Sequence, residues 1–224
     1  EDCEPQTVSG WATAISAGAT NESAQVLTFE VTSNSNTALF SAGPAVDAAT
    51  GDLTYTLAAN ANGTATIHLV LVDDGGTANG GSDTSAEQVF TITVDAVEDA
   101  PVVSDSATSV LENTSLGFAA ADFTGQFSDV DTGESLQTVK LTGLASHGTL
   151  KLSGVAVALN DEIAAANLGN LSYQPAEDYV GSDSFQWKGS DGTEYSASAA
   201  TVSISVVLVN HAPSFTKGAD QEVD

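Results

Sequence analysis

The chain has 224 residues, of which 30 are acidic and only 4 are basic, giving a formal net charge of -26 at pH 7. So few lysines and arginines cannot neutralise nucleic-acid phosphates or anionic lipid headgroups, which excludes both as general partners. This balance instead favours cations. The single cysteine, Cys3, excludes an internal disulfide. No apolar run is long enough for a membrane helix, so no membrane insertion is predicted.

Period-2 patterns typical of half-buried strands recur along the chain. Residues 89–94 (VFTITV), 149–152 (TLKL) and 201–208 (TVSISVVL) alternate hydrophobic and polar side chains. Clusters of Gly, Asn, Asp and Ser, such as residues 73–83, separate these runs and are typical of turns. Only residues 161–169 favour a helix, of a single turn. Many short strands between frequent turns predict an all-β protein made of antiparallel β-sandwiches.

The chain also repeats itself, which predicts two copies of one domain. Residues 53–76 match residues 171–192 at an offset of 118, and residues 22–29 match residues 134–141 at an offset of 112. We therefore predict two tandem sandwiches, at residues 1–99 and 100–210, joined near Pro101.

The last residues repeat the start of the second predicted domain. Residues 209–224 match residues 97–112, with Ala-Pro aligned in both. We expect residues 211–224 to be a linker and the opening strand of a further repeat, and the first domain to lack this strand. If the final Val-Asp were followed by Glu1-Asp2, the result would mimic Val-Leu-Glu-Asn at 110–113. Both ends thus read as cuts in a longer protein, and one molecule's tail is hypothesised to complete the first domain of the next.

Acidic residues crowd the joint between the two predicted domains. Asp95, Glu98 and Asp99 lie within five positions, just before Pro101. Calcium takes about six to eight oxygen ligands, so loops that meet at a joint can hold it where a single strand cannot. Without an ion, these carboxylates would repel one another. We predict a calcium ion at the inter-domain joint, and the alternative is ordinary solubilising charge.

Several motifs resemble those of cadherin repeats. Residues 73–101 are similar to the end of such a repeat, with an Asp-Gly loop, a last strand and an acidic linker that ends in Ala-Pro. Residues 110–113 (VLEN) resemble the cadherin glutamate motif, and residues 128–131 (SDVD) resemble the Asp-x-Asp motif. The wider pattern resembles the cadherin-like and Ig-like tandem repeats of large, RTX-type bacterial cell-surface adhesins.

This resemblance implies an elongated string of sandwiches that calcium stiffens between repeats. In a cadherin-like order, Glu1 or Asp2 and the loop 60–62 would face the joint from the first repeat. Two departures stand out: Ala17 and Ala19 align with the Asp-x-Asp motif, and Asn210-His211 replaces the acidic pair in the second linker. The calcium ligands expected from the resemblance are Glu98, Asp99, Glu112, Asp129, Asp131, Glu134 and Asp191.

A second acidic group, Asp73 and Asp74 with Asp83, allows two interpretations. It either binds an ion at the far end of the first repeat or is a solvated loop between the last two strands. The three histidines have no metal-ligand spacing with one another or with Cys3, so zinc is not expected.

No catalytic residues are predicted, and the chain is not expected to be an enzyme. Nucleophile-elbow and phosphate-loop motifs are missing, and Asp183 lies beside serines without a nearby histidine. Phe185 and Trp187 are expected in the core. Trp11 and Tyr179 would offer faces for sugar stacking if they were exposed.

Together these features predict a calcium-stiffened extender of a large bacterial extracellular adhesin, secreted or held at the cell surface, that supports cell or surface adhesion. Its expected partners are calcium and neighbouring repeats of the same chain. Three alternatives remain: a module that binds polysaccharide or another cell-surface ligand, a homophilic module that binds copies on neighbouring cells, and spacer domains of a large secreted enzyme.

Overall fold

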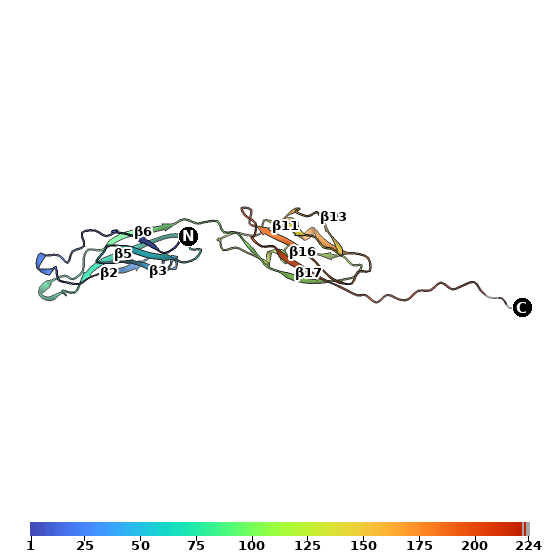
Figure 1. The fold of residues 1–224 in the computed structure, drawn as a ribbon, viewed down its shortest axis with the longest axis horizontal. Helices are drawn as coiled ribbons and strands as arrows, with labels where there is room; N and C mark the ends of the chain where they lie inside the picture. Colours follow the sequence, from blue (N-terminus) through green and yellow to red (C-terminus); the bar gives the residue numbers. More distant parts are fainter. Residues whose placement is uncertain (221, 223–224) are drawn as a thin grey trace. The chain divides into compact units, whose positions relative to one another are not determined.

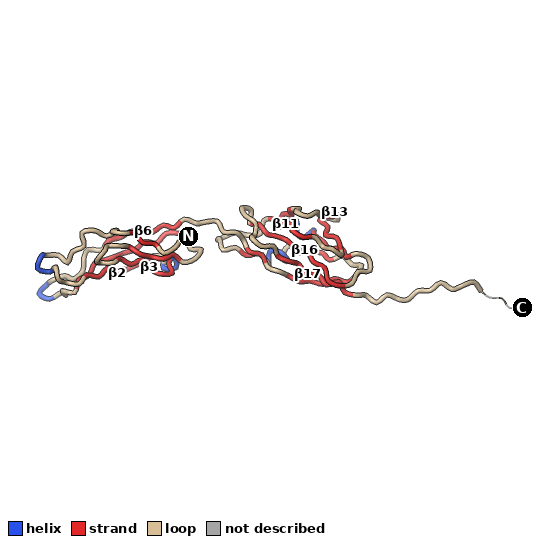
Figure 2. The backbone as a smooth tube through the Cα atoms, in the orientation of Figure 1, coloured by secondary structure: helices blue, strands red, loops and turns tan. Residues whose placement is uncertain are grey.

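The computed structural model describes residues 1–220 and 222 and shows an all-β protein. Short strands are joined by turns, and the helical elements of the described residues are one α-turn and a few 3-10 turns (Figures 1 and 2). The chain divides into two compact units, Glu1–Glu98 and Asp99–Asp224, here called the first and second unit. The all-β fold class predicted from the alternating patterns is confirmed. None of the helices in the described part of the chain is long and apolar enough to cross a membrane.

The first unit contains two three-stranded antiparallel sheets. Its small core lies between them and is formed by Leu39, Phe40, Leu57, Ala65, Ile67 and Ile92. One sheet has the order β1 (Gln6–Val8), β4 (Leu53–Leu57), β3 (Phe40–Val46). The other has the order β2 (Leu27–Asn34), β5 (Gly63–Asp73), β6 (Gln88–Val94). The 3-10 turns are η1 (Thr20–Glu22), η2 (Thr37–Leu39) and η3 (Ala78–Gly80).

The second unit has larger sheets and a larger core. Its main sheet has the order β14 (Glu162–Ala164), β11 (Thr138–Gly143), β16 (Gly181–Ser190), β17 (Ala200–Val207), β8 (Ser106–Leu111). A second sheet has the order β13 (Val155–Ala156), β12 (Gly148–Leu152), β15 (Leu171–Pro175), β9 (Leu116–Gly117), and β10 (Phe127–Ser128) pairs with β7 (Val102–Val103). The helical turns are α1 (Ala121–Thr124) and η4 (Ala165–Asn170).

Two local features of the second unit differ from the sequence predictions. Strand β8 runs parallel to β17, whereas the other strand pairs described are antiparallel. Residues 161–169 do not form a helical turn throughout: Ile163 is a fully buried strand residue opposite Val139, and only the following residues make a 3-10 turn. The buried cross-strand pair outweighs the helix preference of the alanines in this run.

Aromatic side chains fill the core of the second unit. Phe185 and Trp187 alternate along β16 and are 1% and 0% exposed, which confirms their predicted place in the core. The ring of Phe123 lies edge-on to Trp187, with centroids 5.2 Å apart. Because successive strand side chains point to opposite faces, the residue after Trp187, Lys188, reaches solvent and donates to the carbonyl of Ala197.

The two units share one pattern of strand register. Strand β5 pairs with β6 as β16 pairs with β17, so that Gly63 opposite Val94 corresponds to Gly181 opposite Val206. The offsets, 118 on one strand and 112 on the other, are those of the sequence repeat. Strands β5 and β6 are therefore the counterparts of β16 and β17. None of the described residues of the first unit pairs with β6 as β8 pairs with β17.

The segment after β17 has no regular secondary structure among its described residues, 208–220 and 222. Residues 221, 223 and 224, which belong to the predicted opening strand of a further repeat, lie outside the described residues.

Candidate metal centre

A chain of hydrogen bonds joins three aspartates where the linker enters the second unit. The backbone N–H of Asp99 donates to Oδ2 of Asp131 at 2.8 Å, and the N–H of Asp131 donates to Oδ1 of Asp129 at 2.9 Å. The second bond is the local turn that an Asp two residues before a backbone N–H favours. All three residues are half-buried. The Asp-x-Asp loop that follows β10 thus holds the linker residue Asp99 in place.

Asp191 lies directly after β16 and is 5% exposed. Its Oδ1 accepts the N–H groups of Thr193 at 2.5 Å and Glu194 at 2.9 Å. Its Oδ2 is buried without a hydrogen-bond partner, and so is Oδ2 of Asp129. A buried carboxylate oxygen without a donor carries a large desolvation cost, which a cation would offset.

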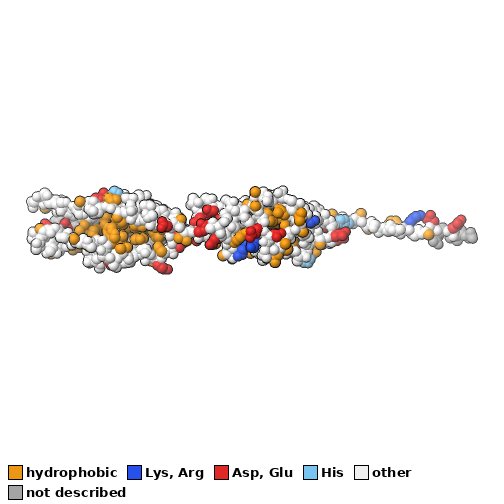
Figure 3. Space-filling view, turned by 90° about the horizontal axis from the view of Figure 1, so that it is seen from above, with side chains coloured by type: hydrophobic (Ala, Val, Ile, Leu, Met, Phe, Trp, Pro, Cys, Tyr) orange, Lys and Arg blue, Asp and Glu red, His pale blue; other side chains and the backbone are white. Residues whose placement is uncertain are grey.

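The surroundings of these aspartates are acidic and contain no balancing ion pair. Among the described residues, no salt bridge joins a lysine or histidine to Asp129, Asp131 or Asp191. Figure 3 shows acidic side chains gathered at one end of the second unit. Glu134 and Glu98, the other two predicted ligands of this end, are exposed. The carboxylates of Asp129, Asp131 and Asp191 do not meet within 4.8 Å of one another, so a shared ion would have to draw them together.

The structure separates Glu112 from the other predicted ligands. The N–H of Glu112 bonds to the carbonyl of Val207, near the end of β16 that begins at Gly181, whereas Asp191 follows the opposite end of that strand. The ten residues of β16 span roughly 30 Å at about 3.3 Å per residue. One ion therefore cannot bind both Glu112 and Asp191, and the set expected from the sequence divides between the two ends of the unit.

At its own end, Glu112 meets two residues that were not predicted as ligands. One oxygen of Glu112, one of Asp178 and a ring nitrogen of His211 lie within 4.8 Å of one another. The distance from Oε1 of Glu112 to Nε2 of His211 is 3.5 Å. In the sequence, His211 marked only a departure from the acidic linker pattern, and no local motif links it to Asp178. The tertiary fold brings the three together.

Glu1 and Asp2 meet the loop 60–62 of the first unit, as the sequence suggested. Nδ2 of Asn62 donates to Oε2 of Glu1 at 3.1 Å, and the N–H of Asn60 donates to Oδ1 of Asp2 at 3.1 Å. The amides and the two carboxylates therefore form one polar end of this unit.

Asp73 and Asp74 hold turns of the first unit. Oδ1 of Asp73 accepts the N–H of Gly75 at 2.8 Å, and Oδ1 of Asp74 accepts the N–H of Val26 at 2.9 Å. Asp73 corresponds to Asp191 in the shared register, but it lines a pocket of about 220 Å³ together with Ala17 and Gly18, where the second unit has its Asp-x-Asp loop. These contacts favour the solvated-loop interpretation of this acidic group.

A buried polar network of the second unit centres on Asp183. Its carboxylate accepts the Tyr173 hydroxyl at 2.7 Å and the N–H groups of Ser146 and His147, both at 2.9 Å. Burial raises the pKa of Asp183, but hydrogen bonds from Ser146, Tyr173, His147 and Ser184 outweigh it and lower that pKa below its usual value. The carboxylate is therefore charged and saturated with donors.

This network corrects the expectation that no histidine lies near Asp183. Nδ1 of His147 is 3.9 Å from Oδ1 of Asp183 and 2.9 Å from Oγ of Ser146. Both partners face the same ring nitrogen, so the imidazole cannot pass a proton between them through its two nitrogens as a catalytic triad requires. The arrangement fits a structural role.

The aromatic side chains considered for sugar stacking are half-buried, and each contacts a neighbouring ring. The ring of Trp11 packs on Phe90 with centroids 4.6 Å apart. Tyr179 stacks on His147 at 4.3 Å, and its hydroxyl donates to the carbonyl of Ser182 at 2.7 Å. His147 therefore covers one face of the Tyr179 ring, whereas Trp11 lines an open groove of the first unit.

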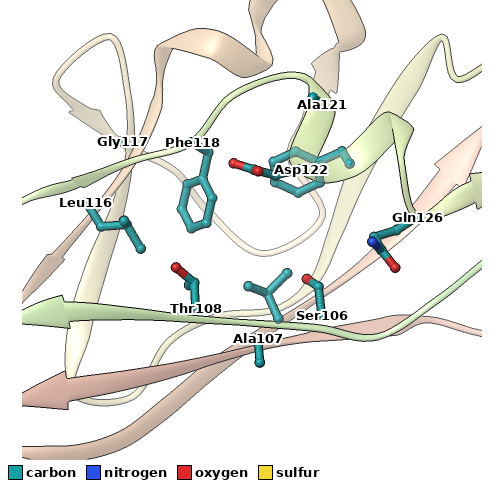
Figure 4. Close-up of a pocket in the computed structure, with 11 residues that line it drawn as sticks. Ser106, Ala107, Thr108, Leu116, Gly117, Phe118, Ala121, Asp122 and Gln126 are labelled. Atoms are coloured by element: carbon teal, nitrogen blue, oxygen red, sulfur yellow. The ribbon is translucent and has the colours of Figure 1, made fainter.

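A cavity of about 270 Å³ lies beside β8 in the second unit (Figure 4). Ser106 and Thr108 line one side, and Phe118 and Asp122 line the other. Oδ2 of Asp122 accepts the N–H of Ala119 at 2.8 Å, which satisfies a free donor at the start of α1. The only charged side chain of this cavity is thus used by the local fold.

Comparison with known proteins gives one family match. Residues 97–207 match the family model of the cadherin-like domain. A search of curated proteins returned no match. Among solved structures, human protocadherin-24 EC1-2 is 16% identical, with 83% of each chain covered and a TM-score of 0.40.

Two further solved structures are less alike. Drosophila N-cadherin EC1-4 is 12% identical over 83% of this chain and 42% of that chain, with a TM-score of 0.29. The endo-fucoidan hydrolase MfFcnA4 from glycoside hydrolase family 107 is 19% identical over 84% of this chain, with a TM-score of 0.30. The chain spans only 24% of the length of that hydrolase. The family match identifies a cadherin-like domain at residues 97–207.

Proposed function

We propose that this chain is an extender module of a large bacterial extracellular adhesin, secreted or held at the cell surface, whose joint is stiffened by calcium. The observation that carries the proposal is the pair of buried carboxylate oxygens, Oδ2 of Asp129 and Oδ2 of Asp191, that have no hydrogen-bond partner. They lie in the loops of the second unit that include the binding partner of the linker residue Asp99. The cadherin-like domain supports the module type and leaves the ion to be tested.

The donor set fits calcium better than other common metals. It consists of carboxylate oxygens from Asp99, Asp129, Asp131 and Asp191, and the exposed Glu98 and Glu134 can add more. Calcium accepts about six to eight oxygen ligands in flexible geometry, whereas magnesium requires a tight octahedron of ligands and retains bound water. Soft or borderline metals prefer sulfur and imidazole, and neither group is among these predicted ligands.

Ion binding would act on the joint through Asp99. Its N–H already donates to Asp131, so the linker is positioned against the Asp-x-Asp loop before any ion binds. Without the ion, mutual repulsion of the carboxylates favours opening of this contact. With the ion, the linker and the loops share one charge centre, which restricts rotation about residues 95–100. A net charge of -26 keeps the protein soluble in saline surroundings, where this repulsion is screened.

The test is thermal unfolding of the full chain in calcium, in magnesium and in chelator at constant ionic strength. Each unit contains one tryptophan, Trp11 or Trp187, so fluorescence of a Trp11→Phe form of the full chain reports the second unit alone. Calcium is expected to raise the melting temperature of the second unit, by linkage of about 2.7 kcal/mol at a hundredfold excess over Kd. Magnesium is expected to raise it much less.

Matched variants locate the effect. Asp191→Asn keeps an acceptor for Thr193 and Glu194 but removes the charge, so it should abolish the calcium shift without lowering stability in chelator. Glu177→Gln removes one exposed charge from the opposite end of the unit and should leave the calcium shift intact. Equal shifts in calcium and magnesium, or an undiminished shift in Asp191→Asn, would refute the site.

Stiffening is measured separately from binding. Small-angle scattering of the full chain should show a narrower distribution of interatomic distances in calcium than in chelator. If calcium binds to the second unit but the two distributions are the same, the extender mechanism is wrong even though the site exists.

A further inference from the structure

We propose that the first unit carries a docking site for the tail of a second copy of this chain. In this arrangement, residues 214–220 of one molecule lie along the outer edge of β6 in another, and Phe215 enters an apolar groove. The inference involves other residues than the calcium site and stands whether or not calcium binds.

The groove lies on the first unit beside β6. It has a volume of about 540 Å³ and includes hydrophobic side chains from β2, β5, β6 and the loop after β1. Those that matter for the argument are Trp11, Ile15, Phe29, Leu71, Val89 and Phe90. Figure 3 shows hydrophobic side chains gathered on this unit. Exposed apolar patches of this kind commonly mark binding sites.

In the second unit, the corresponding place is covered. The offset of 118 that relates β5 to β16 makes Leu71 and Gly189 equivalent positions. A Cβ added to Gly189 would come within 3.0 Å of side-chain atoms of Val103, Phe127 and Leu136. Strand β7, which contains Val103, is thus part of the cover of this face. The described residues of the first unit supply no counterpart of β7.

The neighbouring strand edge shows the same difference. In the second unit, β8 lies parallel to β17, with Ser106 opposite Val202 and Ser109 opposite Ser205. The equivalent edge of β6 pairs with none of the described residues of this chain. An open edge presents unpaired N–H and C=O groups to which another strand can bind.

The tail, residues 209–224, has a sequence that fits the groove and the open edge of β6. Residues 209–224 align with residues 97–112, which places Phe215 over Val103 and Gly218 over Ser106. Phe215 is 92% exposed, the most exposed of the large hydrophobic side chains described. A peptide segment that aligns with β7 and the start of β8 therefore has its large hydrophobic residue in solvent.

The sizes of the paired side chains are exchanged between the two units. Val103 lies opposite Phe127 in the β7–β10 pair. Counting back from the Glu-Ser pairs at 22 and 134 aligns Phe127 with Ile15, which lines the groove. The second unit thus joins a small residue to a large one, and the proposed contact joins the large Phe215 to the smaller Ile15. A volume-conserving exchange of this kind is well tolerated in a packed core.

One contact of the second unit, made by Asp105, has no equivalent in the tail. Oδ1 of Asp105 accepts the N–H of Thr201 at 2.7 Å beside the start of the β8–β17 pair. The tail has Lys217 at the position of Asp105, and lysine is not an acceptor. The tail therefore depends on Phe215 and on strand pairing. Because the tail and the groove are different surfaces, copies would associate head to tail.

Self-association of the full chain tests the proposal. Sedimentation equilibrium, run in reductant because Cys3 is exposed, should show an average mass that rises above 22.6 kDa with concentration. Phe215→Ser lies in a segment without secondary structure and cannot unfold either unit, and it should weaken association roughly tenfold or more. Leu208→Ser removes another exposed hydrophobic side chain outside residues 214–220 and should have little effect.

Two further experiments make the geometry specific. A peptide of residues 209–224 should change Trp11 fluorescence in a saturable way, and its Phe→Ser form should not. Phe215→Val should weaken association, and adding Ile15→Phe should restore it by recreating the Val–Phe pair of the second unit. A mass of 22.6 kDa at all concentrations would overturn the proposal. So would a peptide without effect, or a Phe215-dependent change in Trp11 that is independent of protein concentration, which would indicate that the tail folds back within one molecule.

Discussion

Glu1 and Glu112 occupy the same structural position, one in each unit. Oε1 of Glu1 accepts the N–H of Val97 at 3.0 Å, and Oε1 of Glu112 accepts the N–H of Val209 at 2.6 Å. The two valines that donate these N–H groups are 112 residues apart, which is the offset of the repeat. Each glutamate therefore ties the start of its unit to the segment that leaves it.

The next residues confirm the equivalence. Asp2 and Asn113 both have left-handed backbones, with φ of 58° and 59°. Oδ1 of Asp2 accepts the N–H of Asn60, and Oδ1 of Asn113 accepts the N–H of Asp178. This matches the sequence resemblance between Glu1-Asp2 and the Glu-Asn of the VLEN motif. The glutamate motif thus has a structural role that does not require an ion.

The Glu112 contact should contribute measurably to the stability of the second unit. Glu112 is 4% exposed, so Glu112→Ala leaves the partly buried N–H of Val209 without its acceptor. We expect a loss of about 2 kcal/mol in the unfolding free energy, as for other buried hydrogen bonds to charged groups. Urea unfolding followed by Trp187 fluorescence in a Trp11→Phe background measures it.

Glu112→Gln is the matched control, because its amide oxygen can still accept the N–H of Val209. It should retain most of the stability that Glu112→Ala loses. An alanine variant as stable as the wild type would show that the contact is not part of the folded-state energetics.

Tyr173 and Asp183 should prove strongly coupled. Burial and the hydrogen bond to Asp183 both raise the pKa of Tyr173, so its hydroxyl stays protonated and donates. Tyr173→Phe and Asp183→Asn should each destabilise the second unit by roughly 1–3 kcal/mol. Their double variant should lose less than the sum of the single losses, since each single variant already breaks the shared bond. Additive losses in a double-mutant cycle would contradict a direct contribution of this bond.

The same carboxylate predicts a pH dependence. Burial opposes the charge, but the surrounding donors lower the pKa of Asp183 below its usual 3.8. A group with a lowered folded pKa stabilises above its unfolded pKa, and this stability is lost as the pH falls through the folded pKa. The stability difference between wild type and Asp183→Asn should therefore be constant above about pH 5 and shrink below pH 3.8. A difference that grows on acidification would have the wrong sign.

Much of the fold follows from local pattern. Val202, Ile204 and Val206 alternate with polar residues and are all buried in β17, because side chains on one face of a strand recur at every second residue. Strand direction is not encoded in this alternation, so the parallel pairing of β8 with β17 was not foreseen. The repeat offsets were sufficient to identify equivalent strands, but equivalent positions do not guarantee equivalent environments.

The tyrosines Tyr55 and Tyr173 illustrate this limit. They align in the repeat at the offset of 118, and this alignment predicts the same packing role for both. Tyr173 is fully buried over Asp183, whereas Tyr55 is half-buried and packs edge-on to Phe40 at 6.0 Å. The position of Asp183 is Ala65 in the first unit, so Tyr55 has no carboxylate to receive its hydroxyl. The expectation of one shared role was wrong because the partner strand differs.

The acidic site was only partly predictable for a related reason. The Asp-x-Asp motif and Asp191 could be recognised from residue type, since each follows a strand at a turn. Their distance from Glu112 depends on which end of β16 each residue adjoins, and that requires the strand register. The meeting of Asp178 with His211 depends on the return of the chain after β17 and has no local sequence signal.

Gly148 should be irreplaceable in the core of the second unit. A Cβ at this position would come closer than 3.0 Å to ring atoms of Tyr173, whose ring is fixed by the bond to Asp183. Gly148→Ala is therefore expected to destabilise the unit by roughly 1–3 kcal/mol, since a buried ring cannot move without strain. Gly117, in the same sheet, has no atom within 4 Å of its added Cβ, so Gly117→Ala should be nearly neutral. Equal melting temperatures for these two variants would mean that Tyr173 can shift, and its hydrogen bond would then hold the ring less firmly than the geometry indicates.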